Sequence, residues 1–302
     1  MPKTTLSFYL HIIAVAVIVF ALGNFFYAHP EERAAASVSK DGAQKESVYD
    51  RVMRTKTIRC GYHIWEPFLT KDINTGQMSG IYFDYMQQLG EVLSLKIEWV
   101  EETGFGPHVE ALKNNRFDMM CAGDYQNGAR GRYIDYTAPI LYVALGIMVR
   151  ADDKRFDHDI SLLNDDGIKL SSVEGTTPFI VGNRDFPKSQ KITQPESQDL
   201  MIPLMDVAGC KADAAITGLP LAFRFMAANP GKLRQVPMDH PIRLFGSSLS
   251  LKQNEVAMQN MINNATRELM YSGAIEAIIK KHEKYPGSFY RVSRPYQIDA
   301  AP

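Results

Sequence analysis

The chain has 302 residues, of which 45% are hydrophobic and 22% are charged, enough for one large folded domain or two smaller ones. Its 33 Lys and Arg residues nearly balance its 34 Asp and Glu residues, and no sustained basic or acidic block occurs. Proteins that bind nucleic acid concentrate positive charge against the phosphates, so nucleic acid is not expected as a partner.

The first 28 residues predict a membrane or export segment. No Asp, Glu, Lys or Arg occurs between Thr4 and Ala28. A cleavable signal peptide has an apolar stretch of about 7–15 residues before a small-x-small cleavage site, whereas a bilayer span needs roughly 20 residues. This segment is nearer the spanning length, and Phe26 stands where cleavage after Ala28 would need a small residue. We favour an uncleaved signal anchor in the inner membrane, with a signal peptide as the alternative. Residues 29–47 are small, polar and charged and predict a flexible linker.

From residue 48 onward, short apolar strands alternate with amphipathic helices. We expect helices at residues 47–55, 84–95 and 108–115, and strands at 57–62, 96–100 and 116–123. In the second helix, Tyr85, Leu89, Val92 and Leu93 have near-helical spacing and predict its buried face. Ligands bind beyond the carboxyl ends of such strands, which here lead into the polar and aromatic segments 61–68 and 123–132.

A second alternating unit follows the strand expected at residues 144–150. It has predicted strands at 168–175 and 213–220 and predicted helices at 200–207 and 219–228. The chain then returns in an extended segment at 243–251 and ends in helices at 255–273 and 275–285. The apolar stripe of these last helices comprises Val256, Met261, Ile262, Ala265 and Leu269.

The alternation of strands and helices predicts an α/β fold. Right-handed crossovers would give mainly parallel sheets with helices on both faces. We expect two Rossmann-like lobes joined by a two-strand hinge, preceded by an N-terminal hydrophobic helix. The first lobe would comprise residues 48–145 and 244–290, the second residues 146–243, and residues 291–302 would form a C-terminal tail.

Cysteines and short motifs give no sign of a metal or a cofactor, and neither is expected. Cys60, Cys121 and Cys210 lack C-x-x-C spacing, and we favour small buried side chains over a disulfide, which an oxidising compartment would still permit. No G-x-S-x-G, H-E-x-x-H or P-loop occurs. The Gly104–Gly106 segment lacks the third glycine of a dinucleotide fingerprint.

Six blocks in a fixed order resemble the family 3 extracellular solute-binding proteins, the polar amino acid receptors of ABC importers. The blocks are residues 58–68, 72–93, 110–140, 171–178, 208–218 and 268–285. The resemblance implies the type II periplasmic binding protein fold, in which two lobes close over a small ligand. It also implies a location in the periplasm and, as a partner, the membrane permease of an ABC transporter.

Arg130 is the foremost candidate for ligand binding. In the family the arginine at this place binds the ligand α-carboxylate, and a planar guanidinium can donate two parallel hydrogen bonds to such a group. Arg130 by itself could equally be a solvated surface residue, as Arg132 illustrates. Gly175, Thr176 and Thr177 would hold the same carboxylate from the second lobe, at the start of a helix. The alternative is that these residues form only a strand-to-helix turn with a threonine cap and do not bind the ligand.

Aromatic and polar residues on the first lobe are further candidates. Trp65 lies where the family places an aromatic ring against the ligand; the alternative is that it belongs to the core. Phe105 would form the opposing wall. Gly123 is a further candidate for ligand binding. The other candidates on the first lobe lie on the two loops that face the predicted cleft and would set specificity, unless they are simply solvated: His63, Glu66, Asp124, Tyr125 and Gln126.

Gly218 departs from the family pattern. Amino acid receptors of the family carry an Asp at this place, which pairs with the ligand ammonium. Here either Asp124 or Glu66 supplies that partner, or the ligand has no ammonium group, which we favour. The sequence therefore predicts a receptor for a small anionic or zwitterionic ligand, an amino acid or an organic acid.

Two other functions stay open. A periplasmic enzyme resembling cyclohexadienyl dehydratases would need a cleft acid, for which His63, Glu66 and Glu174 are conceivable. A membrane-anchored sensor or accessory binding module is the other. We expect a binding protein and not an enzyme.

Overall fold

The computed structural model describes residues 46–196 and 199–292. The predicted N-terminal segment, nearly all of the predicted linker and residues 293–302 of the predicted tail lie outside these residues. Within the described ranges, no helix has both the length and the apolarity needed to cross a membrane.

The first lobe begins with strands and helices that alternate along the chain. In order they are α3 (Val48–Thr55), β1 (Thr57–Tyr62), β2 (Thr70–Lys71), β3 (Met78–Ser79), α4 (Ile81–Leu93), β4 (Lys96–Glu102), α5 (His108–Lys113), β5 (Met119–Tyr125), the short 3-10 helix η1 (Arg130–Arg132) and β6 (Ile134–Tyr136). All three helices and all three longer strands expected here from the sequence are present.

Local sequence explains the two covering helices α3 and α4. Ser47 caps α3, because its hydroxyl accepts a hydrogen bond from the backbone N–H of Asp50 at 3.0 Å. The buried face of α4 consists of residues at helical spacing, each of which stabilises the fold by about 1.5–3 kcal/mol through burial. These residues are Ile81, Tyr82, Tyr85, Met86 and Leu89. Val92, expected on this face, is 38% exposed because it lies where the last turn of the helix leaves the core.

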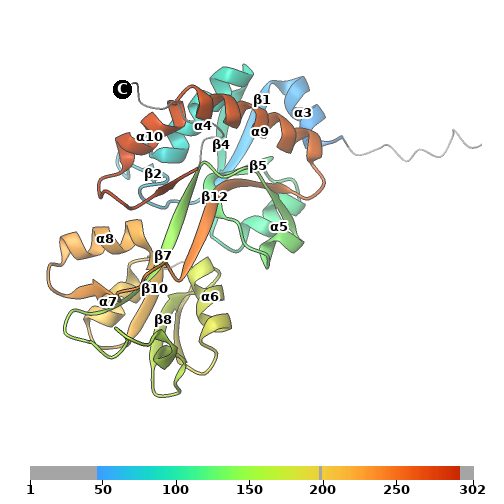
Figure 1. The fold of residues 1–302 in the computed structure, drawn as a ribbon. Coiled ribbons are helices and arrows are strands. Elements are labelled where there is room, and N and C mark those ends of the chain that lie inside the picture. Colours follow the sequence, from blue (N-terminus) through green and yellow to red (C-terminus); the bar gives the residue numbers. More distant parts are fainter. Residues whose placement is uncertain (1–45, 197–198, 293–302) are drawn as a thin grey trace, which may run out of the picture. The chain divides into compact units, whose positions relative to one another are not determined.

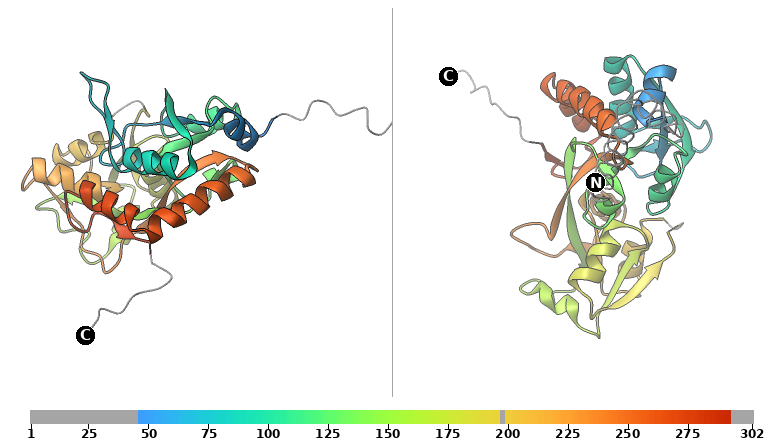
Figure 2. Two further views of the ribbon diagram at one scale, coloured as in Figure 1. Left: turned by 90° about the horizontal axis from the view of Figure 1, so that it is seen from above. Right: turned by 90° about the vertical axis from the view of Figure 1, so that its right-hand side faces the viewer.

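The long strand β7 (Leu141–Arg150) leads from the first lobe to the second. The second lobe contains η2 (Ile160–Asn164), β8 (Lys169–Val173), α6 (Thr177–Asp185), β9 (Gln190–Gln194), α7 (Ile202–Ala208), β10 (Ala214–Gly218), α8 (Leu219–Ala228) and β11 (Leu233–Gln235). Strand β12 (Arg243–Lys252) leads back to α9 (Val256–Tyr271), α10 (Ala274–His282) and β13 (Tyr290–Arg291). The right-hand view of Figure 2 also shows the elements of the two lobes in separate groups.

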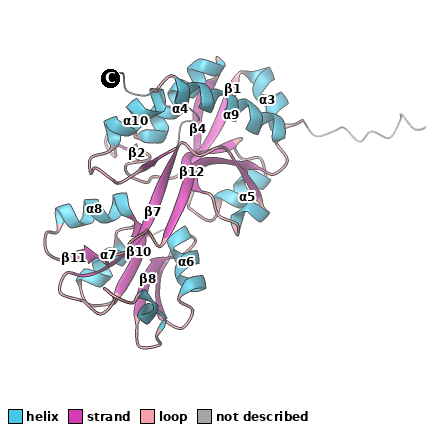
Figure 3. Cartoon of the chain, viewed as in Figure 1, coloured by secondary structure: helices cyan, strands magenta, loops and turns pink. Residues whose placement is uncertain are grey.

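Strands β7 and β12 join the two lobes into one sheet, as Figures 1 and 3 show. The strand order is β4-β1-β5-β12-β7-β10-β8-β9. Strands β4, β1 and β5 of the first lobe are parallel, as are β10, β8 and β9 of the second. Strands β7 and β12 pair antiparallel with each other and with β10 and β5. Residues 247–251 of β12 pair with β5 of the first lobe, and residues 145–149 of β7 pair with β10 of the second. Between the lobes, residues 243–247 of β12 pair with residues 141–145 of β7.

Two expectations at the end of the chain need correction. Val256 is 57% exposed, and Met258 takes its place on the buried face of α9. Arg291, expected in the tail, belongs to β13 and pairs with Leu141 of β7. Its guanidinium holds it there, because it is paired with the carboxylates of Glu276 at 2.9 Å and Glu283 at 2.6 Å.

The cysteine interpretation is also wrong in part. Cys60 of β1 and Cys121 of β5 are fully buried, as expected, but they form a disulfide whose Cα atoms are 5.4 Å apart. The neighbouring strands β1 and β5 bring the two residues together although 61 positions separate them in the sequence. Cys210 is a free cysteine and is exposed instead of buried.

Candidate functional site

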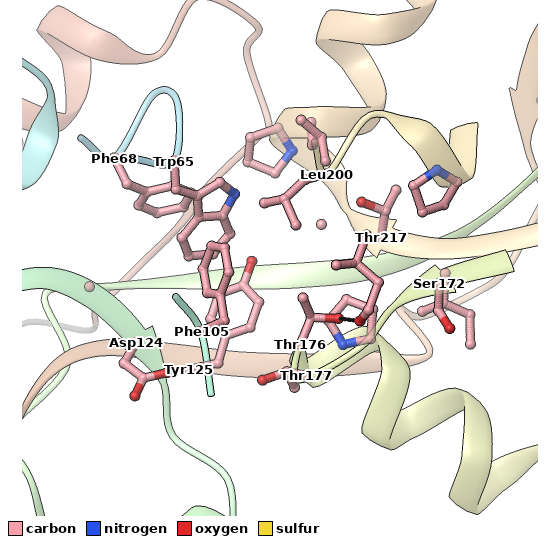
Figure 4. Close-up of a pocket in the computed structure, with 18 of the residues that line it drawn as sticks. Trp65, Phe68, Phe105, Asp124, Tyr125, Ser172, Thr176, Thr177, Leu200 and Thr217 are labelled. Carbon is pink, nitrogen blue, oxygen red and sulfur yellow. Dashed lines mark hydrogen bonds between the residues drawn. The ribbon is translucent and has the colours of Figure 1, made fainter. Parts of the chain in front are cut away.

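A cavity lies where the strand ends of the two lobes face each other (Figure 4). The first lobe contributes the loops that follow β1 and β4, the end of β5 and the 3-10 helix η1. The second lobe contributes the ends of β8 and β10, the helices that begin there and the start of α7. This is the edge of the sheet at which ligands bind in open α/β folds.

Gly123 lets strand β5 approach the helix layer at the cavity. Its φ of +82° favours glycine, and a Cβ atom at this position would lie 2.3 Å from the ring of Tyr82. Tyr82 is itself fixed by a hydrogen bond of 2.8 Å between its hydroxyl and that of Ser247 on β12. This close packing fixes the end of β5, from which Asp124 and Tyr125 reach the cavity.

Arg130 lines the cavity and is only 8% exposed. Its Nη1 atom donates to Oδ1 of Asp124 at 2.7 Å, and its Nη2 atom donates to the backbone carbonyl of Gly175 in the second lobe. The backbone N–H of Arg130 donates to the side chain of Asn127 at 3.0 Å, which fixes the start of η1. Arg130 is therefore held between the lobes, with a carboxylate of its own chain as a partner.

Asp124 stands in a buried polar cluster. Its Oδ2 atom accepts from Nε2 of His108 at 2.9 Å and from the hydroxyl of Ser250 at 3.5 Å. Burial alone would raise the pKa of this carboxyl, but the guanidinium of Arg130 and the interaction with His108 outweigh it and lower the pKa to about 2. Asp124 is therefore ionised at neutral pH and bound on both oxygens.

The aromatic wall of the cavity is continuous. Trp65 stacks on Phe68 with ring centroids 4.1 Å apart, and Tyr125 and Phe105 meet the indole edge-to-face at 4.9 and 5.8 Å. Phe105 thus contacts Trp65 instead of facing it across a gap, because the loop that follows β4 folds over the end of β1. Such ring pairs add to the stabilisation gained from burial alone.

The second lobe presents small polar groups to the cavity. Thr176 caps helix α6: its hydroxyl accepts from the N–H of Phe179 at 3.3 Å and donates to the carbonyl of Val173 at 2.7 Å. Thr177 lines the cavity, and Gly175 reaches the site through its carbonyl group. Gly218 also lines it, and a Cβ atom there would lie 2.9 Å from the hydroxyl of Tyr125.

The predicted residues Gly175, His63, Glu66 and Gln126 do not line the cavity. His63 is buried against the ring of Phe105, with centroids 4.1 Å apart. Burial and the nearby charge of His108 lower its pKa to about 3, so it is neutral at physiological pH. Glu66 lies in a smaller pocket beside the cavity, where it pairs with Arg224 at 2.6 Å and Lys284 at 3.4 Å.

Several residues of the cavity were not singled out from the sequence. They include Phe68, Ser172, Leu200, Pro203, Ile216 and Thr217. Phe68 belongs to the Pro-Phe pair of the first block, and Ser172 and Thr217 lie within predicted strands, which were the available signals. In the described part of the chain, no group of three His, Cys, Asp or Glu residues is arranged to hold a metal ion.

Comparisons with known proteins agree with this architecture. A curated protein of Campylobacter jejuni subsp. jejuni, named "Probable histidine-binding protein", is 23% identical over 221 residues, which are 72% of this chain and 81% of that protein. The crystal structure of the ancestral amino acid-binding protein AncCDT-1, a precursor of cyclohexadienyl dehydratase, has a TM-score of 0.69 at 23% identity and covers 79% of this chain and 100% of its own. The solute receptor for L-cysteine of Neisseria gonorrhoeae has a TM-score of 0.68 at 18% identity, covering 82% and 100%.

These structures share the fold, that of type II periplasmic binding proteins, which confirms the predicted fold class. The family described as bacterial extracellular solute-binding proteins, family 3, matches residues 58–284. The match spans most of the chain and agrees with the resemblance of the six sequence blocks. The chain therefore belongs to the family 3 extracellular solute-binding proteins.

Proposed function

We propose that the protein is a periplasmic receptor that closes over a small carboxylate-bearing ligand, an amino acid or an organic acid, and presents it to the permease of an ABC transporter. In this proposal residues 48–145 and 244–290 move against residues 146–243 about β7 and β12. Family membership supports the general role, and the site supports the ligand class.

The position of Arg130 is the observation that carries the proposal. Its guanidinium belongs to the first lobe and already contacts the second, and it lines the cavity between them. A guanidinium has five N–H donors, of which the bonds to Asp124 and Gly175 use two. The remaining donors can bind a carboxylate, and a cavity closed to water strengthens such bonds.

Contacts between the lobes support a closing mechanism. Besides the bond from Arg130 to Gly175, the backbone N–H of Gly106 donates to the carboxylate of Glu196, and Arg224 pairs with Glu66. The side chains of Arg224 and Glu66 are partly exposed, at 40% and 33%, so their pair can break and reform at small cost. A ligand that contacts both lobes would add further contacts between them and so favour the closed form.

The residues considered for a dehydratase do not support that alternative. Glu66 is paired in the neighbouring pocket, His63 is buried behind Phe105, and Glu174 is exposed and does not line the cavity. The acidic side chain that does line the cavity, Asp124, is held ionised by its partners and is a poor proton donor. Turnover of prephenate or arogenate by the purified protein would favour the enzyme over the receptor.

Calorimetry with the full chain in mild detergent tests the role of Arg130. A thermal-shift screen of amino acids and organic acids first identifies a ligand, because a bound ligand stabilises the folded state. Arg130→Ala should then weaken its binding by about 2–5 kcal/mol, whereas Arg132→Ala, which removes an exposed arginine of the same short helix, should leave it unchanged.

The combined change Arg130→Met with Asp124→Asn serves as a second variant, since it removes both charges of the buried pair together. Unchanged affinity in this variant and in Arg130→Ala would contradict the proposal.

A further inference from the structure

The charges that line the cavity cancel each other. Among the described residues of the lining, the charged side chains are Asp124 and Arg130, and they are paired at 2.7 Å. Most of the other lining residues are aromatic, aliphatic or proline, and the polar ones carry hydroxyl groups. A ligand entering this cavity meets a largely apolar wall, one shared guanidinium and no carboxylate that lacks a partner.

Asp124 is not available to a cationic group of a ligand. Both of its oxygens accept hydrogen bonds from the protein, from Arg130 on one side and from His108 and Ser250 on the other. Its side chain is 3% exposed. These bonds use three of the roughly four lone-pair sites of the carboxylate, and the protein covers the side chain almost completely, so it offers little to an ammonium group that must give up its water.

Tyr125 carries a buried hydroxyl in the cavity wall that lacks a hydrogen-bond partner. The residue is 5% exposed, and its hydroxyl makes no hydrogen bond within the described structure. Its ring is fixed by Trp65 at 4.9 Å and by stacking on Phe245 at 5.6 Å, so the hydroxyl cannot simply turn away. Figure 4 shows this hydroxyl pointing into the cavity. Because buried hydroxyls are normally paired, a ligand atom is the natural partner.

Gly218 and Tyr125 are complementary in size. A Cβ atom on residue 218 would lie 2.9 Å from the Tyr125 hydroxyl, so the tyrosine fills the space that a side chain at 218 would need. A tyrosine hydroxyl donates and accepts hydrogen bonds but carries no charge at neutral pH, and burial raises the pKa of Tyr125 further. The position therefore suits an uncharged oxygen group of a ligand better than an ammonium group.

We propose that the ligand is a carboxylic acid with an apolar body and an uncharged hydroxyl or oxo group, recognised by Tyr125, in preference to the corresponding amino acid. The carboxylate is bound by the remaining donors of Arg130, and the apolar body lies against Trp65 and Phe105. This inference rests on the proposed function, since it names the class of carboxylate that the same cavity selects.

Two matched ligand series test the inference by calorimetry on the full chain in mild detergent. The aromatic series is phenyllactate, phenylpyruvate, phenylpropionate and phenylalanine. The aliphatic series is leucine, its hydroxy acid, its oxo acid and the acid without a substituent. In at least one series the hydroxy or oxo acid should bind about tenfold or more tightly than the amino acid, because an unpaired buried ammonium is penalised.

Variants at Tyr125 locate the effect. Tyr125→Phe should weaken the hydroxy or oxo acid about tenfold and leave the unsubstituted acid unchanged, since only the former uses the hydroxyl. Tyr125→Ser combined with Gly218→Asp places a carboxylate where the tyrosine hydroxyl stood, and should reverse the preference toward the amino acid. If this double variant does not fold, Tyr125→Phe alone still decides.

The possible failures are distinguishable. An amino acid that binds the wild-type protein as tightly as its hydroxy and oxo analogues would overturn the inference and leave the carboxylate receptor standing. Equal losses for substituted and unsubstituted acids in Tyr125→Phe would overturn the role of the hydroxyl. Binding of no carboxylate in either series, or in the wider screen, by the folded protein would overturn the proposed function and the inference together.

Discussion

The two lobes build their faces of the cavity by different means. The first lobe uses buried charge and stacked rings: Arg130 and Asp124 are tied to His108, and Trp65 and Tyr125 pack edge-to-face. The second lobe uses strand ends, a helix cap and small or aliphatic side chains. The first face is thus held in place by interactions within its own lobe, whereas the second face supplies weaker contacts that depend on approach to the first.

The difference suggests an order of events. A face whose polar groups are already fixed can bind a ligand without rearrangement, and the gain is greatest where the groups are preorganised. The second face would then complete the enclosure. Three changes, taken from the largest expected effect to the smallest, test whether the first lobe is the more rigid of the two.

Asp124→Ala should give the largest effect, because it leaves Arg130 buried without its anion. Loss of one partner of a buried pair costs about 3–5 kcal/mol in the free energy of unfolding, measurable by urea denaturation. In the second lobe, Asp206→Ala is the matched change: Asp206 is also buried, but its cationic partner Lys211 is 60% exposed and can turn to water. An equal or larger loss in Asp206→Ala would contradict the comparison.

His63 should make the stability of the first lobe depend on pH. Its pKa is lowered from 6.5 to about 3, chiefly by burial and then by the charges of His108 and Arg130, against the opposing effect of Asp124. Between these values the unfolded chain takes up a proton that the folded chain does not, so the free energy of unfolding should fall as pH falls. The slope from this group is about 1.4 kcal/mol per pH unit between pH 6.5 and 3.

Denaturation series at several pH values in this range measure the slope. His63→Gln removes the titrating group and should flatten the dependence relative to the wild-type protein. His158→Gln, at an exposed histidine of the second lobe, should leave it unchanged. Parallel curves for the wild-type protein and His63→Gln would contradict the prediction.

Thr176→Ala should have the smallest effect, about 1 kcal/mol of unfolding free energy, because it removes the cap of α6. Thr176→Ser keeps the capping oxygen and should restore most of the loss. Since this cap also shapes the cavity face of the second lobe, calorimetry on the same variants shows whether the turn affects ligand binding. A loss as large as that of Asp124→Ala would remove the proposed difference between the lobes.

The regular elements were largely predictable from sequence periodicity. The strands and helices of the first lobe alternate with clear apolar spacing, and helix α9 was expected from its stripe. Strand β9 was missed because its residues, Gln190–Gln194, are mostly polar and only half buried. Val92 and Val256 were wrongly expected to be buried. They share the spacing of buried neighbours but lie in the last turn of α4 and the first turn of α9, which the core does not cover.

The partners of the site residues were not predictable. Arg130 and the cavity segments could be named from their pattern, but the contact of Arg130 with Gly175 joins residues 45 positions apart in different lobes. The fit between Tyr125 and Gly218 depends on strands that meet only through β7 and β12. The Cys60–Cys121 disulfide likewise depends on which strands are neighbours, which spacing alone does not give.

The exposed thiol of Cys210 has a practical consequence. The sequence contains three cysteines, and the other two are joined to each other, so a thiol-reactive dye would attach at one place, in the second lobe. Both tryptophans of the chain, Trp65 and Trp99, lie in the first lobe. Energy transfer from the indoles to a dye on Cys210 would therefore report the approach of the lobes in the unmutated protein, as each candidate molecule is added.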